Sequence, residues 1–140
     1  VKVNGSQMGR FDSTGLYVSG EVAGFYSDER LKANIQPITG ALDKVNQLKG
    51  VTYTGNEIAV KFGFNDTSEQ VGLLAQDLQK VLPQVVRPAP FDTATDETTG
   101  KKYSISGEDY KTVQYDKIVP LLVEAIKELS DKVKKLEGKK

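Results

Sequence analysis

The clearest pattern of hydrophobic and polar positions lies near the end of the chain. Two apolar series each repeat every seven residues there and are offset by three, with β-branched residues in one series and leucines in the other: Val119, Leu122, Ile126, Leu129, Val133 and Leu136. This spacing is typical of an a/d coiled-coil seam. Asp116 is placed to cap the helix, and Pro120 is close enough to its start to be tolerated. The pattern predicts a helix from Asp116 to about Leu136 with an intersubunit seam.

An ordinary amphipathic helix packed on its own core is the alternative, because the seam is only about three heptads long. Ile118, Leu121, Val123 and Ala125 widen the apolar face in the first half of the helix. We therefore expect the first half to pack on the domain and the second half to pair with copies of itself. The residue types at a and d favour two helices over three.

The segment between residues 39 and 87 alternates between helical and extended patterns. Two short helices and three strands are predicted there: helices over 40–48 and 74–82, and strands over 51–54, 58–64 and 85–86. Thr39 is expected to cap the first helix, and Pro83 to stop the second. These elements and the C-terminal helix predict a small α+β domain.

Residues 88–114 form the least core-like part of the chain. Pro88 and Pro90 open the segment, residues 93–99 are mostly polar, and the flanks over 102–105 and 111–115 alternate as strands do. A surface loop without any client is the alternative, although long structureless loops are uncommon. The alternation favours an extended β-hairpin arm.

Residues 1–26 differ from the rest of the chain in composition and pattern. Five glycines separate short apolar runs, and Asp12-Ser13-Thr14-Gly15 is a turn signal. Such short strands need partners to bury a core, so we predict that 1–26 is the end of a β-rich stalk and 27–140 a separate domain. The chain starts at Val1, and its first Met is at position 8. We expect it to be a piece of a longer polypeptide.

Composition narrows the chemistry that the chain can perform. The 140 residues include 19 basic and 19 acidic ones, so the formal net charge is zero and no nucleic-acid or anionic-membrane partner is expected. No apolar run reaches the roughly 20 residues that span a bilayer. Cys and His are both absent, which excludes disulfides, thiol catalysis, His-based triads and Cys or His metal sites. No cofactor is expected, and acid–base chemistry must use Asp, Glu, Lys, Tyr or a hydroxyl.

One stretch carries candidate chemistry, namely Ser-Asp-Glu-Arg-Leu-Lys-Ala-Asn-Ile over residues 27–35. A Ser hydroxyl becomes a good nucleophile when a base takes its proton, and a neutral Lys amine can be that base. Spacing alone does not distinguish this from an ordinary surface segment, in which Ser27 caps a helix while Arg30 and Lys32 are solvated.

Five blocks in order give the chain a family resemblance: the 27–35 stretch, Ala41-Leu42 with Val45 and Leu48, Gly72 to Gln76, Leu82 to Val86, and Tyr115 to Leu129. Together they resemble the C-terminal intramolecular chaperone and self-cleaving peptidase domains of phage endosialidases, tailspikes and tail fibres. Leu16 to Gly20 also resembles the strand and turn that lead into such domains.

The resemblance implies a homotrimer that guides folding of the fibre stalk ahead of it and then cuts itself off. The cut would fall between Tyr26 and Ser27, with Ser27 as nucleophile and Lys32 as general base. Asn34, Gln76 or backbone amides would stabilise the oxyanion, and Arg30 would support Lys32. The resemblance also implies assembly in the host bacterial cytoplasm and an upstream fibre in the virion tail.

Lys32 can act as a base only without its proton, and a free Lys titrates near about 10.4. Burial would favour the neutral amine, and a nearby cation such as Arg30 would act in the same direction. Asp28 and Glu29 would oppose it, so we expect both to point elsewhere. Three other interpretations remain: a non-cleaving trimerisation cap, a serine hydrolase acting on other proteins, and a domain of a eukaryotic self-cleaving membrane protein.

Overall fold

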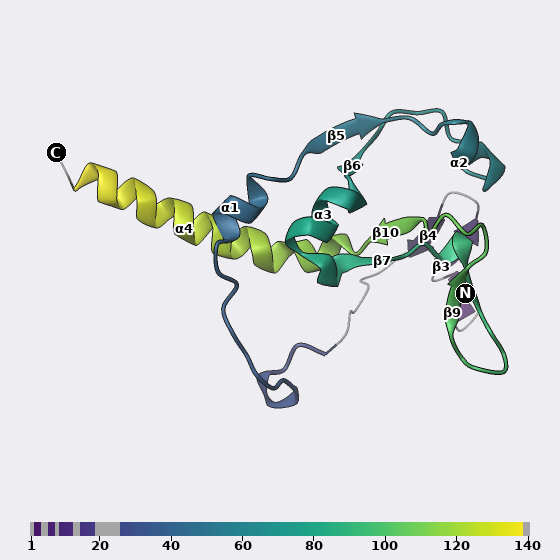
Figure 1. Ribbon diagram of the computed structural model, residues 1–140, viewed down its shortest axis with the longest axis horizontal. Helices are drawn as coiled ribbons and strands as arrows, with labels where there is room; N and C mark the ends of the chain where they lie inside the picture. The colour runs from purple at the N-terminus through teal and green to yellow at the C-terminus, as the bar shows by residue number, and fades with distance from the viewer. Residues whose placement is uncertain (1, 4–5, 8, 13–14, 19–25, 139–140) are drawn as a thin grey trace. The chain divides into compact units, whose positions relative to one another are not determined.

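The computed structural model describes residues 2–3, 6–7, 9–12, 15–18 and 26–138 of the chain. The chain divides into two compact units, Val1–Gln36 with Tyr53–Gln70 and Pro37–Thr52 with Val71–Lys140. Short helices and antiparallel strand pairs accompany one long C-terminal helix, α4 (Val119–Glu137) (Figure 1). The predicted α+β class with a long C-terminal helix is confirmed.

Two groups of buried side chains form the core of the second unit, and both contact Leu48 and Leu82. The first group joins α3 (Ala75–Val81) to the residues just before and just after the arm: Leu78, Val85, Val86 and Ile118. The second joins α1 (Ala41–Val45) to α4: Ala41, Leu121 and Ala125. Because the two groups share partners, α1, α3 and the start of α4 pack as one body.

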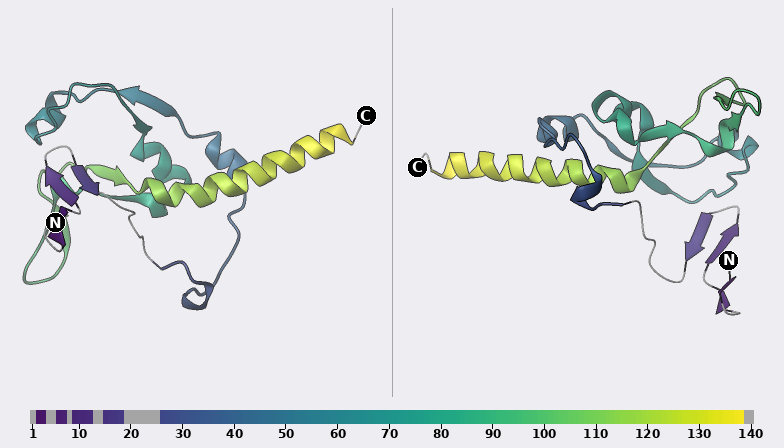
Figure 2. Two further views of the ribbon diagram at one scale, coloured as in Figure 1. Left: turned by 180° about the vertical axis from the view of Figure 1, so that it is seen from behind. Right: turned by 90° about the horizontal axis from the view of Figure 1, so that it is seen from below.

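Helix α4 begins later than the sequence predicts. A 3₁₀ turn, η4 (Tyr115–Ile118), contains Asp116 and leads directly into the helix, whose N-cap is the apolar Ile118. The prediction of an Asp116 cap was therefore wrong, whereas Pro120 lies in the first turn, where its missing N–H costs nothing. Helix α1 lies beside the middle of α4, and the last turns of α4 extend beyond it (Figures 1 and 2).

Helix α1 is shorter than predicted and is capped from a distance. Its N-cap is Gly40, at a left-handed φ of 61°, so the predicted Thr39 cap was wrong. The carboxylate of Glu128 on α4 instead accepts the backbone N–H groups of Ala41 and Leu42, each at 2.9 Å. These bonds lower the pKa of Glu128. A carboxylate at a helix N-terminus is favourable because the first N–H groups have no partner within the helix.

The predicted β-hairpin arm is present. Strands β7 (Val86–Pro88) and β10 (Lys111–Val113) pair antiparallel at its base, with Val113 opposite Val86. Strands β8 (Thr93–Thr95) and β9 (Lys102–Ser104) pair antiparallel further out, with Thr95 opposite Lys102. A 3₁₀ turn, η3 (Pro90–Asp92), joins β7 to β8.

The prediction of a strand over 58–64 was wrong, whereas its neighbours are close to expectation. The segment contains helix α2 (Glu57–Lys61), because the Asn56 side chain caps the N–H groups of Ile58 and Ala59, each at 3.0 Å. Gly63, with a φ of 89°, follows its end. Strand β5 (Gly50–Tyr53) pairs with β6 (Gln70–Leu73), and η2 (Pro83–Val85) follows α3.

Near the N-terminus the structure has four short strands in two antiparallel pairs. Strand β1 (Lys2–Val3) pairs with β2 (Ser6–Gln7), and β3 (Gly9–Asp12) pairs with β4 (Gly15–Val18). Asp12 lies opposite Gly15, while the middle of the predicted turn, residues 13–14, is outside the described residues. The short strands agree with a β-rich segment, and its assignment to a stalk stays a prediction.

Candidate active site and assembly face

A single 3₁₀ turn brings Lys32 back to Ser27. The turn is η1 (Glu29–Leu31), and the side chain of Asp28 caps it by accepting the backbone N–H of Arg30 at 2.9 Å. The backbone N–H of Lys32 donates to the Glu29 carbonyl at 3.0 Å. The cap of this turn is thus Asp28, not Ser27, which leaves the Ser27 hydroxyl available for another contact.

The Lys32 amine contacts the Ser27 hydroxyl. Lys32 Nζ donates to Ser27 Oγ at 3.3 Å, and both residues are exposed in the single chain. This is the pair that the resemblance implied. The contact is slightly longer than the roughly 2.6–3.2 Å typical of a nucleophile and its base, and such contacts are often loose before the reacting complex forms. The burial that would favour a neutral amine is not provided by the described part of this chain.

Asp28 and Arg30 form an ion pair beside this contact. Arg30 donates from Nε to Oδ1 at 3.0 Å and from Nη2 to Oδ2 at 2.7 Å. These side-chain bonds, with the backbone N–H of Arg30, lower the pKa of Asp28. The Asp28 carboxylate therefore binds Arg30 rather than Lys32, as expected. The same bonds occupy the guanidinium of Arg30, the cation that was expected to act on Lys32.

The remaining predicted site residues lie on two different units. Asn34 follows the turn at a left-handed φ of 54°, a conformation that Asn tolerates better than most residues. Gln76 is exposed on α3 in the second unit. Tyr26, before the predicted cut, is also exposed. The roles of Asn34 and Gln76 as oxyanion stabilisers, and the cut itself, stay predictions.

The predicted seam of α4 is an exposed apolar stripe. Its six side chains are 42–68% exposed: Val119, Leu122, Ile126, Leu129, Val133 and Leu136. The domain packs instead on the neighbouring stripe, where Leu121 and Ala125 are buried and Glu128 caps α1. Of the residues expected to pack in the first half, Ile118, Leu121 and Ala125 are buried, while Val123 is 44% exposed. Helix α4 therefore has one face that packs on its own domain and a separate apolar face that is exposed in the single chain.

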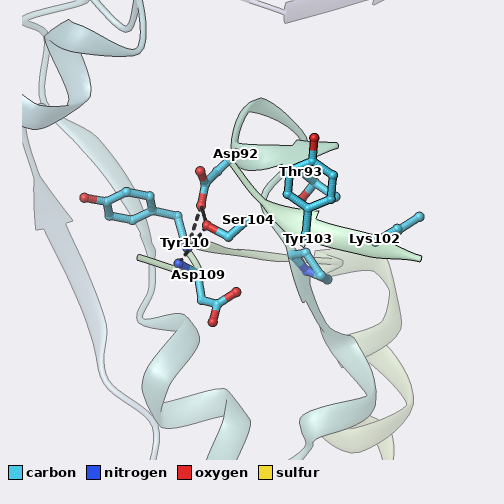
Figure 3. Close-up of a pocket in the computed structure, with 8 residues that line it drawn as sticks. Asp92, Thr93, Lys102, Tyr103, Ser104, Asp109 and Tyr110 are labelled. Carbon is cyan, nitrogen blue, oxygen red and sulfur yellow. Dashed lines mark hydrogen bonds between the residues drawn. The ribbon is translucent and has the colours of Figure 1, made fainter. Parts of the chain in front are cut away.

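The sequence gives no indication of a buried carboxylate in the arm. Asp92 accepts hydrogen bonds from the Ser104 hydroxyl at 2.7 Å, the Ser106 N–H at 2.8 Å and the Tyr110 N–H at 3.2 Å. Burial raises the pKa of Asp92, but these bonds outweigh it and lower the pKa to about 2. Figure 3 shows Asp92 and Ser104 at a small pocket whose lining residues all come from the arm. The Ser104-Ile105-Ser106-Gly107 run supplies two of the donors, but by itself it does not point to Asp92.

No helix in the described part of the chain is long and apolar enough to cross a membrane. Among the same residues, no cluster of three or more acidic side chains is arranged to hold a metal ion.

Comparisons with known proteins agree with the sequence motifs. A family described as chaperone of endosialidase matches residues 27–87, a range that starts at Ser27 and includes Lys32. The Long tail fiber protein Gp37 of Enterobacteria phage K3 and that of phage T2 are each 37% identical to this chain over 143 residues, 99% of it. That of phage M1 is 33% identical over 112 residues.

The chain spans about a tenth of the length of the K3 and T2 relatives and 38% of the M1 relative. The likeness to these fibres covers 99% of the chain. The family match covers η1, α1, α2 and α3. The resemblance in the sequence is thereby confirmed: residues 27–87 of this chain match the chaperone of endosialidase family.

Proposed function

We propose that this domain trimerises, guides the folding of a phage tail fibre ahead of it, and then releases itself by cutting the Tyr26–Ser27 bond. The contact between Lys32 Nζ and Ser27 Oγ at 3.3 Å is the observation that carries the cleavage step. The family match, which starts at Ser27, and the names of the long tail fibre relatives support the chaperone role.

In the proposed reaction, neutral Lys32 takes the proton of the Ser27 hydroxyl as Oγ attacks the carbonyl carbon of Tyr26. The new Oγ–C bond forms while the C–N bond breaks, and Lys32 returns the proton to the Ser27 amine. Water then hydrolyses the ester, which leaves a carboxylate on Tyr26 and regenerates the hydroxyl. Attack within one chain is favoured because Oγ belongs to the residue that follows the carbonyl.

In this proposal, assembly provides the burial that Lys32 lacks in the single chain. Lys32 is exposed in the single chain, and an amine in water keeps its proton at neutral pH. We propose that the assembly of three chains buries the 27–35 turn and so favours the neutral amine. Cleavage would then occur only after three chains have assembled. We propose a trimer because the family resemblance implies one, although the residue types at a and d favour two helices.

The arm is proposed to act on the client. Tyr103 is 56% and Ile105 63% exposed near the end of β9, so the arm carries apolar side chains that a partner could bury. An arm lying along the emerging stalk would keep its unpaired strand edges from aggregating.

The cleavage step is tested by two substitutions in the full chain. Ser27→Ala and Lys32→Ala should each leave an uncut chain on a denaturing gel, because either one removes an atom that the reaction needs. Lys61→Ala, at an exposed lysine of α2, is the matched control and should be cut like the wild type. Cutting in either dyad variant would contradict the assignment.

A non-cleaving trimerisation cap is the second candidate, and the exposure of Lys32 favours it. In that case the wild type and Ser27→Ala chains would have the same length, while both would still trimerise.

A further inference from the structure

The Asp28–Arg30 ion pair belongs to the same turn as the dyad. The Asp28 carboxylate accepts two bonds from the Arg30 guanidinium and one from the Arg30 backbone N–H. Charged bonds to both oxygens of a carboxylate are strong and directional. The carboxylate therefore lies between the guanidinium and the backbone of η1, while Lys32 contacts Ser27.

Asp28 and Lys32 are nevertheless close enough to influence each other. The bonds from Arg30 are the main cause of the lowered pKa of Asp28, and the charge of Lys32 lowers it further. A carboxylate on this turn without a bound cation would attract a positive charge at Lys32. An ammonium cannot accept the Ser27 proton.

We propose that Asp28 and Arg30 are positioning residues for the Ser27–Lys32 pair. Arg30 neutralises the Asp28 carboxylate, so that the carboxylate can cap the turn without holding Lys32 in its protonated form. This inference rests on the proposed cleavage. It also replaces the role that the sequence suggested for Arg30, because the guanidinium acts on Asp28 rather than directly on Lys32.

The test compares the pH dependence of self-cleavage in the full chain and three variants. Arg30→Gln should move the midpoint of the pH–rate profile upward by roughly one unit, which is about a tenfold slower rate at neutral pH. Asp28→Asn combined with Arg30→Gln should restore the wild-type midpoint, since Asn keeps an oxygen that can cap the turn. Arg30→Lys, which keeps the positive charge, should lie near the wild type.

A purely structural role gives a different result. If the pair only orders the turn, Arg30→Gln slows cleavage equally at every pH, and the double variant is at least as slow as the single one. Either of these outcomes would overturn the proposal.

A second measurement does not depend on cleavage. In a Ser27→Ala chain, acetic anhydride modifies neutral amines, and the extent of modification at Lys32 can be compared by mass spectrometry with that at exposed Lys101. Arg30→Gln should lower the modification of Lys32 severalfold, and adding Asp28→Asn should restore it. Unchanged modification contradicts the inference. A wild-type chain as uncut as Ser27→Ala contradicts the proposed function instead, and the two failures are thus distinguishable.

Discussion

Asp92 shows how one residue can hold a hairpin arm together. It is 1% exposed and accepts bonds from Ser104, the last residue of β9, and from Ser106 and Tyr110 in the segment that follows. The three donors lie on the returning side of the arm, so the carboxylate ties that side to η3. A buried ionised group is stable only when it is well hydrogen-bonded, as it is here.

Asp92→Asn should destabilise the arm most at neutral pH. The pKa of Asp92 is lowered to about 2 in the folded chain, below the unfolded value of about 3.9, so its stabilising effect is complete above pH ~4 and is lost as the pH falls towards 2. The difference in melting temperature between wild type and variant should shrink over this range. Asp43→Asn, at an exposed position in the same unit, is the control. A difference that stays constant with pH would contradict this origin of the stability.

The two residue-scale sites differ in how well the sequence predicts them. Ser27 and Lys32 are five positions apart, so one local turn joins them, and a family resemblance singled them out. The partners of Asp92 are 12, 14 and 18 positions away, and only the folded hairpin brings them together. The Asp28–Arg30 bond is local, yet opposite charges two positions apart are too common in sequences to be noticed.

At the scale of elements, α4 has two adjacent apolar stripes, one packed on the domain and one exposed. Leu121 and Ala125 pack on the domain, whereas Leu122, Ile126 and Leu129 of the seam are exposed. An exposed apolar stripe of this length on a helix is costly to leave in water and indicates a partner surface. The adjacent stripes explain how one helix could belong to its own domain and to a coiled coil at once.

Leu129→Asp should dissociate the oligomer and leave the domain folded. An Asp in a coiled-coil seam is buried without a partner in every chain, which should weaken association by roughly a hundredfold or more. Analytical ultracentrifugation measures the change, and Lys134→Asp, outside both stripes, is the matched control. If cleavage depends on assembly, Leu129→Asp should also remain uncut at concentrations where the control is cut. An oligomer that survives Leu129→Asp would place the interface elsewhere.

The sequence predicts elements well where the periodic signal is long. Helix α4 was recognised from six apolar positions spaced by three and four, and its observed end, Glu137, is one residue from the expected one. The short segment 58–64 alternates like a strand, but the Asn56 cap makes α2 instead. Thr39 and Asp116 looked like caps, yet Glu128 caps α1 from 86 and 87 positions away and α4 starts from a 3₁₀ turn. Local signals thus fail where a distant or neighbouring segment satisfies the same groups.

At the scale of the whole molecule, the chain combines short N-terminal strands, the 27–35 turn with its Ser27–Lys32 contact, and a unit that carries the arm and the exposed stripe of α4. The relatives from phages K3 and T2 are about ten times as long as this chain. The client in our proposal would therefore be a long fibre, and one domain at its end would act on it before being released.

The arm should matter for the yield of the fibre rather than for the fold of the domain. Tyr103→Ser combined with Ile105→Ser removes exposed apolar side chains and keeps the Asp92 bonds, so the domain should remain folded. In the full fibre polypeptide, this double variant should lower the fraction of soluble, protease-resistant fibre severalfold. Lys101→Ser with Lys102→Ser is the control on the same arm. An unchanged yield would mean that the arm does not contact the client through these residues.

Native mass spectrometry of the freshly purified chain tests the central claim most directly, because one spectrum measures both assembly and cleavage. We predict trimers whose subunits begin at Ser27, and in Ser27→Ala trimers of the uncut chain. A wild-type spectrum that contains only intact 140-residue chains, whether single or assembled, would contradict self-release by the Ser27–Lys32 pair.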